Sequence, residues 1–484
     1  MAATIHSAAQ RATPASLGQD GARFRWPTSR LGQISRRVLV LAILAPLFAI
    51  VTIKLFDVSG DWIFAAYGVG VIGSTCLVMY LAFGTYIDPS EGIDEPGWEP
   101  KVTMLLAVHN EIDQIEDCIE SIVLSSYRDL EVIVIDDAST DGTAQLLANP
   151  SSFVLRATLL KMAKAGTFQL IALEKNVGKK AALVEGVRRS TGEVLAFTDS
   201  DCRLAPDALD LCIRALRRNP EFGAVSGHAR ALNSEKNFLT RVQDVWYDGQ
   251  FGVSKAAEAS LGSVTCVSGP LAVFRREAIE NYFPAWANDS FAGRPFRFAT
   301  DRQLTGYVLG QVWMGAKLKA RYAMDPLVTT VDHPARLWRI GYVRSAKVWT
   351  NVPETVKGFM KQQIRWKKSF TRNLFFTGTF IWRRGLRIAV IYYLHVLFVL
   401  VAPLMATRHL IIMPLTGMWF LVMLYFAGIF LKGAIWGMAF RAQNPGSDRW
   451  VYRPLMSVVS ALCLSWLLFY SIATLRKGTW SRTL

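Results

Sequence analysis

The chain has 484 residues, of which 51% are hydrophobic, and carries a formal net charge of +16. This length allows one large domain or two to three ordinary ones. The basic excess flanks the apolar segments at both ends of the chain, which is typical of the cytoplasmic side of a membrane protein, and no nucleic-acid-binding motif accompanies it, so we exclude nucleic acid as a partner. Six cysteines without a C-x-x-C pair exclude a zinc site and a disulfide framework, and they indicate free thiols in a reducing compartment.

The N-terminal region predicts a membrane anchor. Residues 1–35 are polar and lack periodicity, so we expect them to be disordered. Residues 36–88 contain two apolar segments, Val38 to Phe56 and Trp62 to Tyr86, and about 20 such residues are enough to cross a bilayer. The link between them has no basic residue, so both flanks are expected in the cytoplasm.

Residues 99–335 are predicted to form a cytoplasmic α/β domain, which follows a Pro/Gly/Glu-rich linker at 89–100. Strand and helix signals alternate along this region, and that alternation predicts a mostly parallel sheet with helices on both faces. The strand signals lie at 102–108, 130–135, 168–173, 193–197 and 222–226. The helix signals lie at 112–124, from Thr143, within 151–166, at 179–189 and at 207–218.

Polar residues follow four of these strands at the point where each strand ends. Because the carboxyl ends of parallel strands meet at one edge of a sheet, we expect these side chains to converge there. A glycine and a lysine at a helix start suit a pyrophosphate, and two carboxylates in a D-x-D pattern suit Mg²⁺ or Mn²⁺. Singly, the D-x-D is as well explained by an ordinary turn and the lysine by a solvated helix. The candidate site residues are His109, Glu111, Asp137, Lys179, Asp199 and Asp201.

The C-terminal third returns to the membrane. Residues 336–385 are basic with interleaved apolar residues, and up to 368 this pattern predicts an amphipathic interfacial helix, with a solvated helix as the alternative. Residues 386–484 contain apolar spans at 386–406, 410–431 and 455–475, so we expect three or four transmembrane helices. An odd total leaves the basic tail outside, against the charge rule, so we favour an even total.

The ordered motifs resemble those of the inverting, membrane-bound family 2 glycosyltransferases of the GT-A fold, whose processive branch includes hyaluronan, chitin and cellulose synthases. The resemblance covers about Val102 to the C-terminus. It departs from the hyaluronan-like pattern at Thr300, where that branch usually has an acidic or Gly-Asp lead, and the donor sugar therefore stays open. The matching segments are Asp137 in IDDAST, N-x-G-K at 176–179, TDSD at 198–201, CVSGPLAVFRRE at 266–277, TDRQLT at 300–305, the QQIRW form of Q-x-x-R-W at 362–366, and the final 474–482.

The resemblance implies a role for each matched residue. Asp301 is the expected general base that deprotonates an acceptor hydroxyl, so that in-line displacement converts an α-linked UDP-sugar into a β-glycosidic bond. Asp201 is expected to hold Mg²⁺ or Mn²⁺. The expected substrate-binding residues are His109, Glu111 and Asp137 for the uridine, Lys179, Asp199 and Arg365 for the diphosphate, Gln362 beside them, and Trp366 for the acceptor sugar. The alternative for Q-x-x-R-W alone is an interfacial helix with an anchoring tryptophan.

We therefore expect an α/β GT-A catalytic domain joined to an α-helical transmembrane bundle, in the plasma or inner membrane with the catalytic domain in the cytoplasm. The expected activity is processive transfer from a UDP-sugar (UDP-GlcNAc, UDP-GlcUA or UDP-Glc) to a growing polysaccharide, which leaves through a channel in the bilayer. A non-processive enzyme that makes a glycolipid is the first alternative. A non-catalytic membrane scaffold is the second. The Asp332-His333-Pro334 segment is expected to be a turn.

Overall fold

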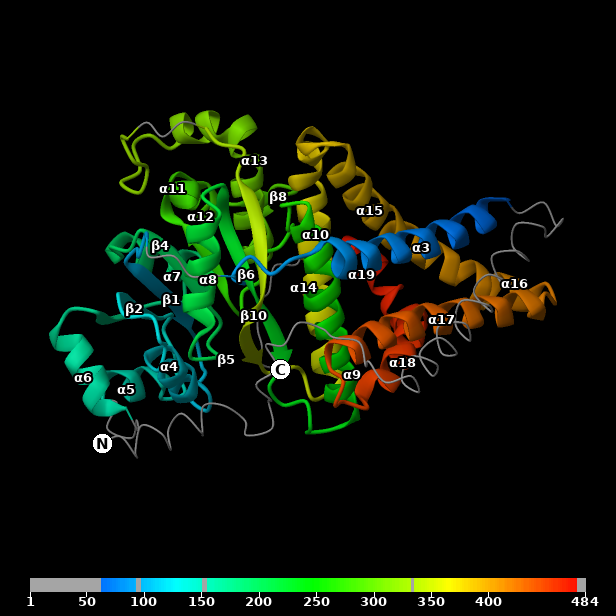
Figure 1. The fold of residues 1–484 in the computed structure, drawn as a ribbon, viewed down its shortest axis with the longest axis horizontal. Helices are drawn as coiled ribbons and strands as arrows, with labels where there is room; N and C mark the ends of the chain where they lie inside the picture. The colour runs from blue at the N-terminus through cyan, green and yellow to red at the C-terminus, as the bar shows by residue number, and fades with distance from the viewer. Residues whose placement is uncertain (1–61, 93–96, 150–154, 332–334, 477–484) are drawn as a thin grey trace.

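The computed structural model describes residues 62–92, 97–149, 155–331 and 335–476. Figure 1 shows an α/β domain on one side of the molecule and long helices on the other. Some predictions fall outside the described residues: the disorder at 1–35, the first span at 38–56, the turn at 332–334 and most of the 474–482 motif.

The α/β domain is built on an eight-stranded sheet in the order β3-β2-β1-β4-β7-β6-β10-β5. β3, β2, β1 and β4 are parallel, β7 is antiparallel to β4 and β6, and β10 is parallel to β6 and antiparallel to β5. The sheet therefore confirms the predicted mostly parallel α/β architecture. Its strands are β1 Val102–Val108, β2 Leu130–Asp136, β3 Phe168–Ala172, β4 Val194–Thr198, β5 Cys202–Leu204, β6 Phe222–Ala231, β7 Ala272–Arg275 and β10 Arg339–Thr350, and a separate hairpin pairs β8 Ser290–Phe291 with β9 Arg294–Pro295.

Helices that follow the strands pack against this sheet. Every residue of β2 and β4 is buried, which explains why the sequence shows continuous apolar runs there instead of alternation. The helices of the domain are α4 Ile115–Val123, α5 Thr143–Ala148, α6 Arg156–Lys164, α7 Lys179–Arg189, α8 Ala208–Arg218, α9 Phe238–Asp248, α10 Ala256–Ser260, α11 Arg276–Ile279, α12 Phe283–Ala287 and α13 Thr300–Arg321. The predicted helices at 112–124, 143, 151–166, 179–189 and 207–218 correspond to α4, α5, α6, α7 and α8.

The predicted amphipathic helix over 336–368 is wrong for its first half. Residues Arg339–Thr350 form β10, a long strand of the sheet, and helix α14 Val356–Leu374 begins only after it. Ile340, Tyr342 and Val348 are fully buried, because β10 lies between two other strands. Sheet packing therefore overrides the basic, aromatic pattern that suggested a membrane-surface helix. The sheet of the α/β domain extends to Thr350, beyond the predicted boundary at 335.

A bulge in β10 joins the sheet to the first described membrane helix, α3 Trp62–Tyr80. The register of β10 against β6 shifts between Tyr342 and Lys347. The Tyr86 hydroxyl donates a hydrogen bond to the Tyr342 carbonyl at 2.8 Å, and the Ser345 amide donates one to the Asp88 carboxylate at 2.8 Å. The chain that leaves α3 is thus fastened to an interior strand of the catalytic sheet.

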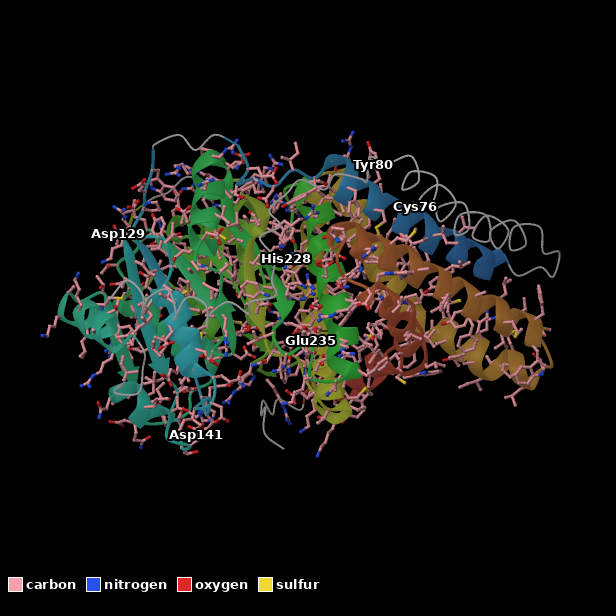
Figure 2. All side chains as sticks on the ribbon, turned by 60° about the horizontal axis from the view of Figure 1, so that its bottom comes forward. Cys76, Tyr80, Asp129, Asp141, His228 and Glu235 are labelled. Atoms are coloured by element: carbon pink, nitrogen blue, oxygen red, sulfur yellow. The ribbon has the colours of Figure 1, made fainter. Side chains whose placement is uncertain are left out.

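Three described helices are long and apolar enough to cross a membrane: Ala66–Thr85, Leu386–Leu415 and Trp419–Gln443. They comprise α3 with its π-helical end, α15 Leu386–Thr407 with α16 Met413–Leu415, and α17 Trp419–Gln443, and they lie on the side of the molecule away from β2 and β3 (Figure 1). Figure 2 places Cys76 and Tyr80 on α3 in this helical region. The span predicted at 410–431 lies further along the chain, because the preceding helical segment continues to Leu415.

The span predicted at 455–475 is a pair of helical segments, Arg449–Leu464 and Leu467–Ala473, that bends by 43°. It contains α18 Tyr452–Val459 and α19 Leu467–Ala473. At its start, the Arg449 guanidinium lies 2.8 Å from the Asp244 carboxylate on α9. At its end, Leu475 packs against the aromatic cluster of Phe296 and Phe298. Both ends of the bent pair therefore contact the α/β domain.

Candidate active site

The carboxyl edge of the sheet gathers the residues that follow β1 and β2. In the sequence, Asp129 precedes β2 and Asp141 follows it. Figure 2 shows these two residues on opposite sides of the domain, so Asp141 marks the carboxyl edge. His109 Nδ1 lies 2.9 Å from the Asp137 carbonyl oxygen, which ties the end of β1 to the end of β2. The Glu111 amide donates to the Thr143 hydroxyl at 3.1 Å. The predicted convergence of His109, Glu111 and Asp137 at one edge is therefore present.

Asp137 fixes the turn that starts helix α7. Its carboxylate accepts hydrogen bonds from the Val177 amide at 2.7 Å and the Gly178 amide at 2.9 Å, and its side chain is buried. Gly178 has φ = +88°, a conformation that favours glycine. The turn presents Lys179 at the helix N-terminus, where the Lys179 ammonium contacts the Asp199 carboxylate. Asp137 thus has a structural task in addition to the uridine contact that the sequence predicts.

The D-x-D residues form an acidic group at the end of β4. Ligand atoms of Asp199, Asp201 and Cys202 all lie within 4.8 Å of one another. Burial, followed by the charges of Asp201 and Asp199, raises the pKa of the Cys202 thiol well above its usual range, so this residue stays protonated. A neutral thiol does not suit a hard cation, whereas two carboxylates suit Mg²⁺ or Mn²⁺. The two aspartates fit such an ion and the cysteine does not.

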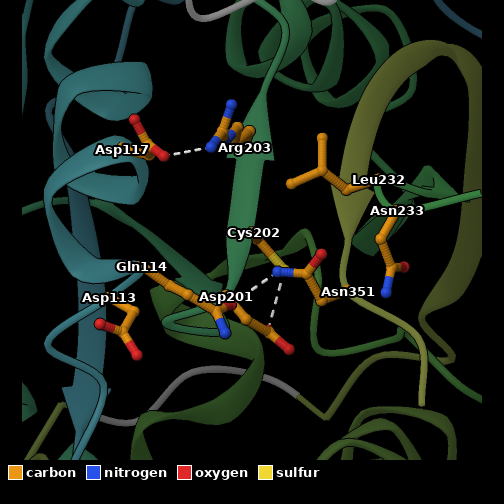
Figure 3. Close-up of a pocket in the computed structure, with 9 residues that line it drawn as sticks. All are labelled: Asp113, Gln114, Asp117, Asp201, Cys202, Arg203, Leu232, Asn233 and Asn351. Atoms are coloured by element: carbon orange, nitrogen blue, oxygen red, sulfur yellow. Dashed lines mark hydrogen bonds and ion pairs between the residues drawn. The ribbon is translucent and has the colours of Figure 1, made fainter. Parts of the chain in front are cut away.

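A cavity of about 450 Å³ opens beside Asp201. Figure 3 shows Asp201 close to Gln114 and Asn351, and the Asn351 amide donates to Gln114 Oε1 at 2.7 Å. Amide and carboxylate side chains are suitable partners for hydroxyl-rich ligands. The other lining residues are Asp113, Asp117, Cys202, Arg203, Leu232 and Asn233.

Asp301 lies in the first turn of α13, where the helix dipole favours a negative charge. Its Oδ1 accepts a hydrogen bond from the Arg302 amide at 2.9 Å, and its Oδ2 accepts one from the Cys266 thiol at 3.3 Å. Ala299, just before this turn, has φ = +60°, and the Ser369 hydroxyl accepts a hydrogen bond from its amide at 3.0 Å. A non-glycine residue in this conformation is strained, and such strain is typical of functional sites.

The Cys266–Pro270 turn connects Asp301 with the D-x-D. Cys266 contacts Asp301 at one end of the turn. At the other end, a Cβ atom added to Gly269 would lie 2.9 Å from Asp199 Oδ2. The Val267 amide donates to the Thr305 hydroxyl at 2.8 Å, which fastens the turn to α13. One short turn therefore contacts both the expected base and the expected diphosphate residue.

The Q-x-x-R-W motif lies on α14 and packs against α9. Gln362 Nε2 donates to the Tyr247 hydroxyl at 3.4 Å, and the Trp366 ring centroid lies 5.9 Å from that of Tyr247. Burial, followed by the charge of Asp201, raises the pKa of Tyr247, whereas the charge of Arg365 lowers it. Tyr247 thus interacts electrostatically with both Asp201 and Arg365, and it links the Q-x-x-R-W motif to the D-x-D. Trp366 is 38% exposed, so part of its ring remains accessible beside Tyr247.

Comparison with known proteins then decides the family. The model "Glycosyl transferase family 2" matches residues 103–283, and the model "Glycosyl transferase family group 2" matches residues 194–432. This chain is a family 2 glycosyltransferase. Its sheet and its D-x-D edge are those of a GT-A-like domain, and long apolar helices accompany it, as the sequence predicted.

This glycosyltransferase is similar to several curated proteins. An N-acetylglucosaminyltransferase from Azorhizobium caulinodans is 27% identical over 432 residues, which cover 85% of this chain and 98% of that protein. A hyaluronan synthase from Streptococcus pyogenes is 30% identical over 308 residues, which cover 63% of this chain. The alignment spans 64% of the hyaluronan synthase, slightly less than two thirds of its length.

Solved structures are more distant from the glycosyltransferase. A mannosyltransferase from Pyrobaculum calidifontis in complex with GDP-Man and Mn²⁺ is 20% identical, with a TM-score of 0.49, and the match covers 89% of this chain and 99% of that one. S. aureus TarS in complex with UDP is 12% identical, with a TM-score of 0.39, and covers 78% of this chain and 92% of that one.

Some residues of the glycosyltransferase site have no motif in the sequence. Tyr247 and its neighbour Trp246, whose ring lies 5.5 Å from that of Trp366, come from α9, which carries no recognised pattern. The residues with a positive backbone φ carry no sequence pattern either. Asn110 follows β1, Ala138 follows β2, and Ala299 precedes Asp301. Only the packed structure identifies them.

Proposed function

We propose that this glycosyltransferase is processive and inverting, and that it transfers a sugar from a UDP-sugar to a growing polysaccharide that it exports through the membrane. The observation that carries the proposal is the Cys266–Pro270 turn, because it contacts Asp301 at one end and Asp199 at the other. A single five-residue turn thus lies against both the proposed base and the proposed diphosphate residue. Relatives named N-acetylglucosaminyltransferase and hyaluronan synthase make UDP-GlcNAc the first donor to test.

In this proposal Asp301 accepts the proton of an acceptor hydroxyl. The hydroxyl oxygen forms a bond to the anomeric carbon while the bond from that carbon to the diphosphate breaks, so the configuration inverts and UDP leaves. General base catalysis typically contributes about 10²–10⁴-fold to the rate. The thiol of Cys266 and the amide of Arg302 hold the carboxylate in place.

The remaining residues bind the two substrates. Mg²⁺ or Mn²⁺ held by Asp201 would take up charge on the diphosphate. Lys179, at the N-terminus of α7, and Arg365 supply cations to the diphosphate, and Asp199 would act on the diphosphate through the metal ion and through Lys179, whose ammonium it contacts. The uridine lies against His109, Glu111 and Asp137, while Gln362 positions Tyr247 and Trp366 stacks on the acceptor sugar.

The proposed location is the plasma or inner membrane, with the catalytic domain in the cytoplasm and the acceptor polysaccharide passing between the apolar helices. The site lies close to the apolar helices, because α14, which carries Trp366, packs against α19, where the Ser471 hydroxyl donates to the Ile364 carbonyl at 3.5 Å. Arg384 fastens this connection, since its guanidinium donates to the carbonyls of Trp338 at 2.7 Å and Leu309 at 2.9 Å.

The test is UDP release by the purified protein in lipid nanodiscs, with UDP-GlcNAc, UDP-GlcUA and UDP-Glc supplied singly and in pairs. Asp301→Asn should lower kcat by about 10²–10⁴-fold and leave UDP-sugar binding by calorimetry intact. Asp325→Asn, beyond the far end of α13, is the matched control and should keep full activity. Robust turnover by Asp301→Asn would refute the base, and a product of one sugar on a lipid would establish the glycolipid alternative.

A further inference from the structure

A buried charged cluster lies behind the site and has no part in the chemistry described above. The Lys180 ammonium lies 3.2 Å from Asp289 Oδ2 and donates to Gln303 Oε1 at 2.7 Å and to the Phe296 carbonyl at 3.1 Å. On the other side, Arg372 Nη2 lies 2.7 Å from Asp289 Oδ1. Lys180, Asp289 and Gln303 are all buried.

Three members of this cluster, Lys180, Gln303 and Arg372, belong to helices that carry an expected site residue, and Asp289 lies in the loop before β8. Lys180 follows Lys179 on α7, and Gln303 lies two positions after Asp301 on α13. Arg372 lies about two turns beyond Arg365 and Trp366 on α14. The cluster therefore joins the three helices through two groups: the Lys180 ammonium reaches α13, and the Asp289 carboxylate links Lys180 to Arg372 on α14.

The face of α14 that carries Arg372 also contacts the segment from Asp289 to Ala299, which precedes Asp301 in the sequence. The Ser369 hydroxyl accepts the hydrogen bond of the strained Ala299 amide, and Lys368 Nζ lies 5.5 Å from the centre of the Phe298 ring. Arg372 lies over the Phe291 ring at 5.4 Å. The segment from Asp289 to Ala299 is thus fastened at its start, middle and end before the chain enters α13.

Stability alone is a poor explanation for such a cluster. Burying charges costs desolvation energy that their attraction often only balances, so an apolar core would serve stability as well. Specific hydrogen bonds between buried charges, however, favour one relative placement of the elements that they join, and here Lys180 donates to three oxygens while Asp289 accepts from both Lys180 and Arg372.

We propose that Lys180, Asp289 and Arg372 are positioning residues that set the placement of Asp301 relative to Lys179 and to the Arg365–Trp366 segment. This inference rests on the proposed function. The three residues do not touch the reacting atoms in the proposal, and they act through the helices that present the base, the donor lysine and the acceptor tryptophan.

The charge of Lys180 provides an independent readout. Burial lowers the pKa of Lys180 to about 8, against the attraction of Asp289, while Arg372 also lowers it and Asp301 raises it. Tyr307, which accepts a hydrogen bond from Gln303, is a further titratable group at the cluster, and burial, followed by the charge of Asp289, raises its pKa above its usual value, so it stays neutral over this range. As the pH rises through about 8, Lys180 loses its proton, Asp289 keeps only Arg372, and placement of the base should loosen.

The first experiment is Asp289→Asn, which keeps the size of the side chain and removes its charge. Misplacement of a catalytic group by about 1 Å can cost about 10²-fold, so we expect kcat to fall by roughly 10–100-fold while KM for the donor stays within about threefold. Arg188→Gln is the matched control: Arg188 is on the same helix as Lys180, pairs with Asp325 at 3.8 Å, and should not affect kcat. Calorimetric UDP binding shows that the variant is folded.

The second experiment compares pH profiles of kcat. The natural protein should lose activity above pH 8, and Lys180→Arg, which keeps its charge, should hold its activity to higher pH. Lys180→Met should be impaired at every pH. Unchanged kcat in Asp289→Asn, loss of kcat and UDP binding in parallel, or identical pH profiles for the natural protein and Lys180→Arg would each overturn the inference. No UDP release by the natural protein with any donor would instead refute the proposed function.

Discussion

Two regions of the site, which we call the donor side and the base side after the roles proposed for their residues, are built by different means. On the donor side, polar residues directly follow β1, β2 and β4, and neighbouring parallel strands bring them to one edge. On the base side, Asp301 depends on contacts from Cys266 and, through Ala299, from Ser369, which lie far from it along the chain. Local sequence order therefore places the donor residues, whereas long-range packing places the base.

This difference predicts how each side should respond to substitution. Changes on the donor side should act on the donor and the metal directly. Changes on the base side should act on the relative placement of groups, with donor binding preserved. The following predictions, from the largest effect to the smallest, test that contrast.

The largest effect after that of Asp301 is expected for Asp201→Asn. A catalytic metal supplies several kcal/mol, so kcat/KM should fall by roughly 10²–10³-fold, and the Mn²⁺ concentration needed for half-maximal activity should rise. Asp113→Asn is the control, since Asp113 lines the same cavity but lies outside the acidic group. An Asp201→Asn enzyme with an unchanged metal requirement would remove the metal from the donor side.

Gly269→Ala tests the turn that connects the two sides. Its Cβ would approach the Asp199 carboxylate to 2.9 Å, so either the turn or Asp199 must move. We expect kcat to fall by about tenfold or more, because small displacements of reacting groups are costly. Gly446→Ala, where a Cβ meets nothing within 4 Å, should be neutral. Equal activity of the two variants would show that the turn does not couple Asp199 with Asp301.

Asp137→Asn tests whether a donor-side residue acts through the fold as well. The two amide hydrogen bonds of its carboxylate are charge-assisted and worth roughly 1.5–3 kcal/mol each, so Tm should fall and KM for the donor should rise. Asp141→Asn is the matched control, since the Asp141 carboxylate also accepts a hydrogen bond from a backbone amide, that of Thr143 at 3.0 Å. This variant should lower Tm without affecting KM for the donor. A KM effect of equal size in both variants would contradict a specific role for Asp137.

The smallest effect on activity is expected from the cysteine substitutions that test the membrane topology. Both ends of the bent pair contact the catalytic domain, so we expect the pair to re-enter the bilayer without crossing it and the basic tail to stay in the cytoplasm. Single cysteines at Gly446 and Arg476, with Cys76 and Cys463 replaced by serine, should react with an impermeant thiol reagent from the cytoplasmic side, and one at Gly417 from the outside. Labelling of position 476 from outside would show that the pair crosses.

The same contrast explains what the sequence could predict. The strands, the helices α4 to α8 and the convergence of His109, Asp137 and Asp199 follow from hydrophobic runs and one topological rule. The prediction failed at β10, because a long interior strand with a bulge carries the same basic and aromatic residues as a membrane-surface helix.

Contacts between distant segments could not be predicted at all. Lys180 and Asp289 are 109 positions apart, and nothing in the local pattern of either residue indicates the other. Gln362 meets Tyr247 across 115 positions, from a helix without any motif. The six free cysteines, in contrast, agree with the expectation drawn from their spacing, because no packing information was needed for it.

The bulge of β10 has a mechanical consequence. Tyr342 and Ser345 bind the segment that leaves α3, and Arg384 binds Trp338 just before β10 and lies in the segment that enters α15. The sheet is therefore fastened to the apolar helices at two separate points. These two attachments restrain movement of the α/β domain relative to the apolar helices. In the proposed reaction, the force that advances the saccharide by one unit must then arise inside the pocket, and the membrane anchors serve as the fixed frame against which it pushes.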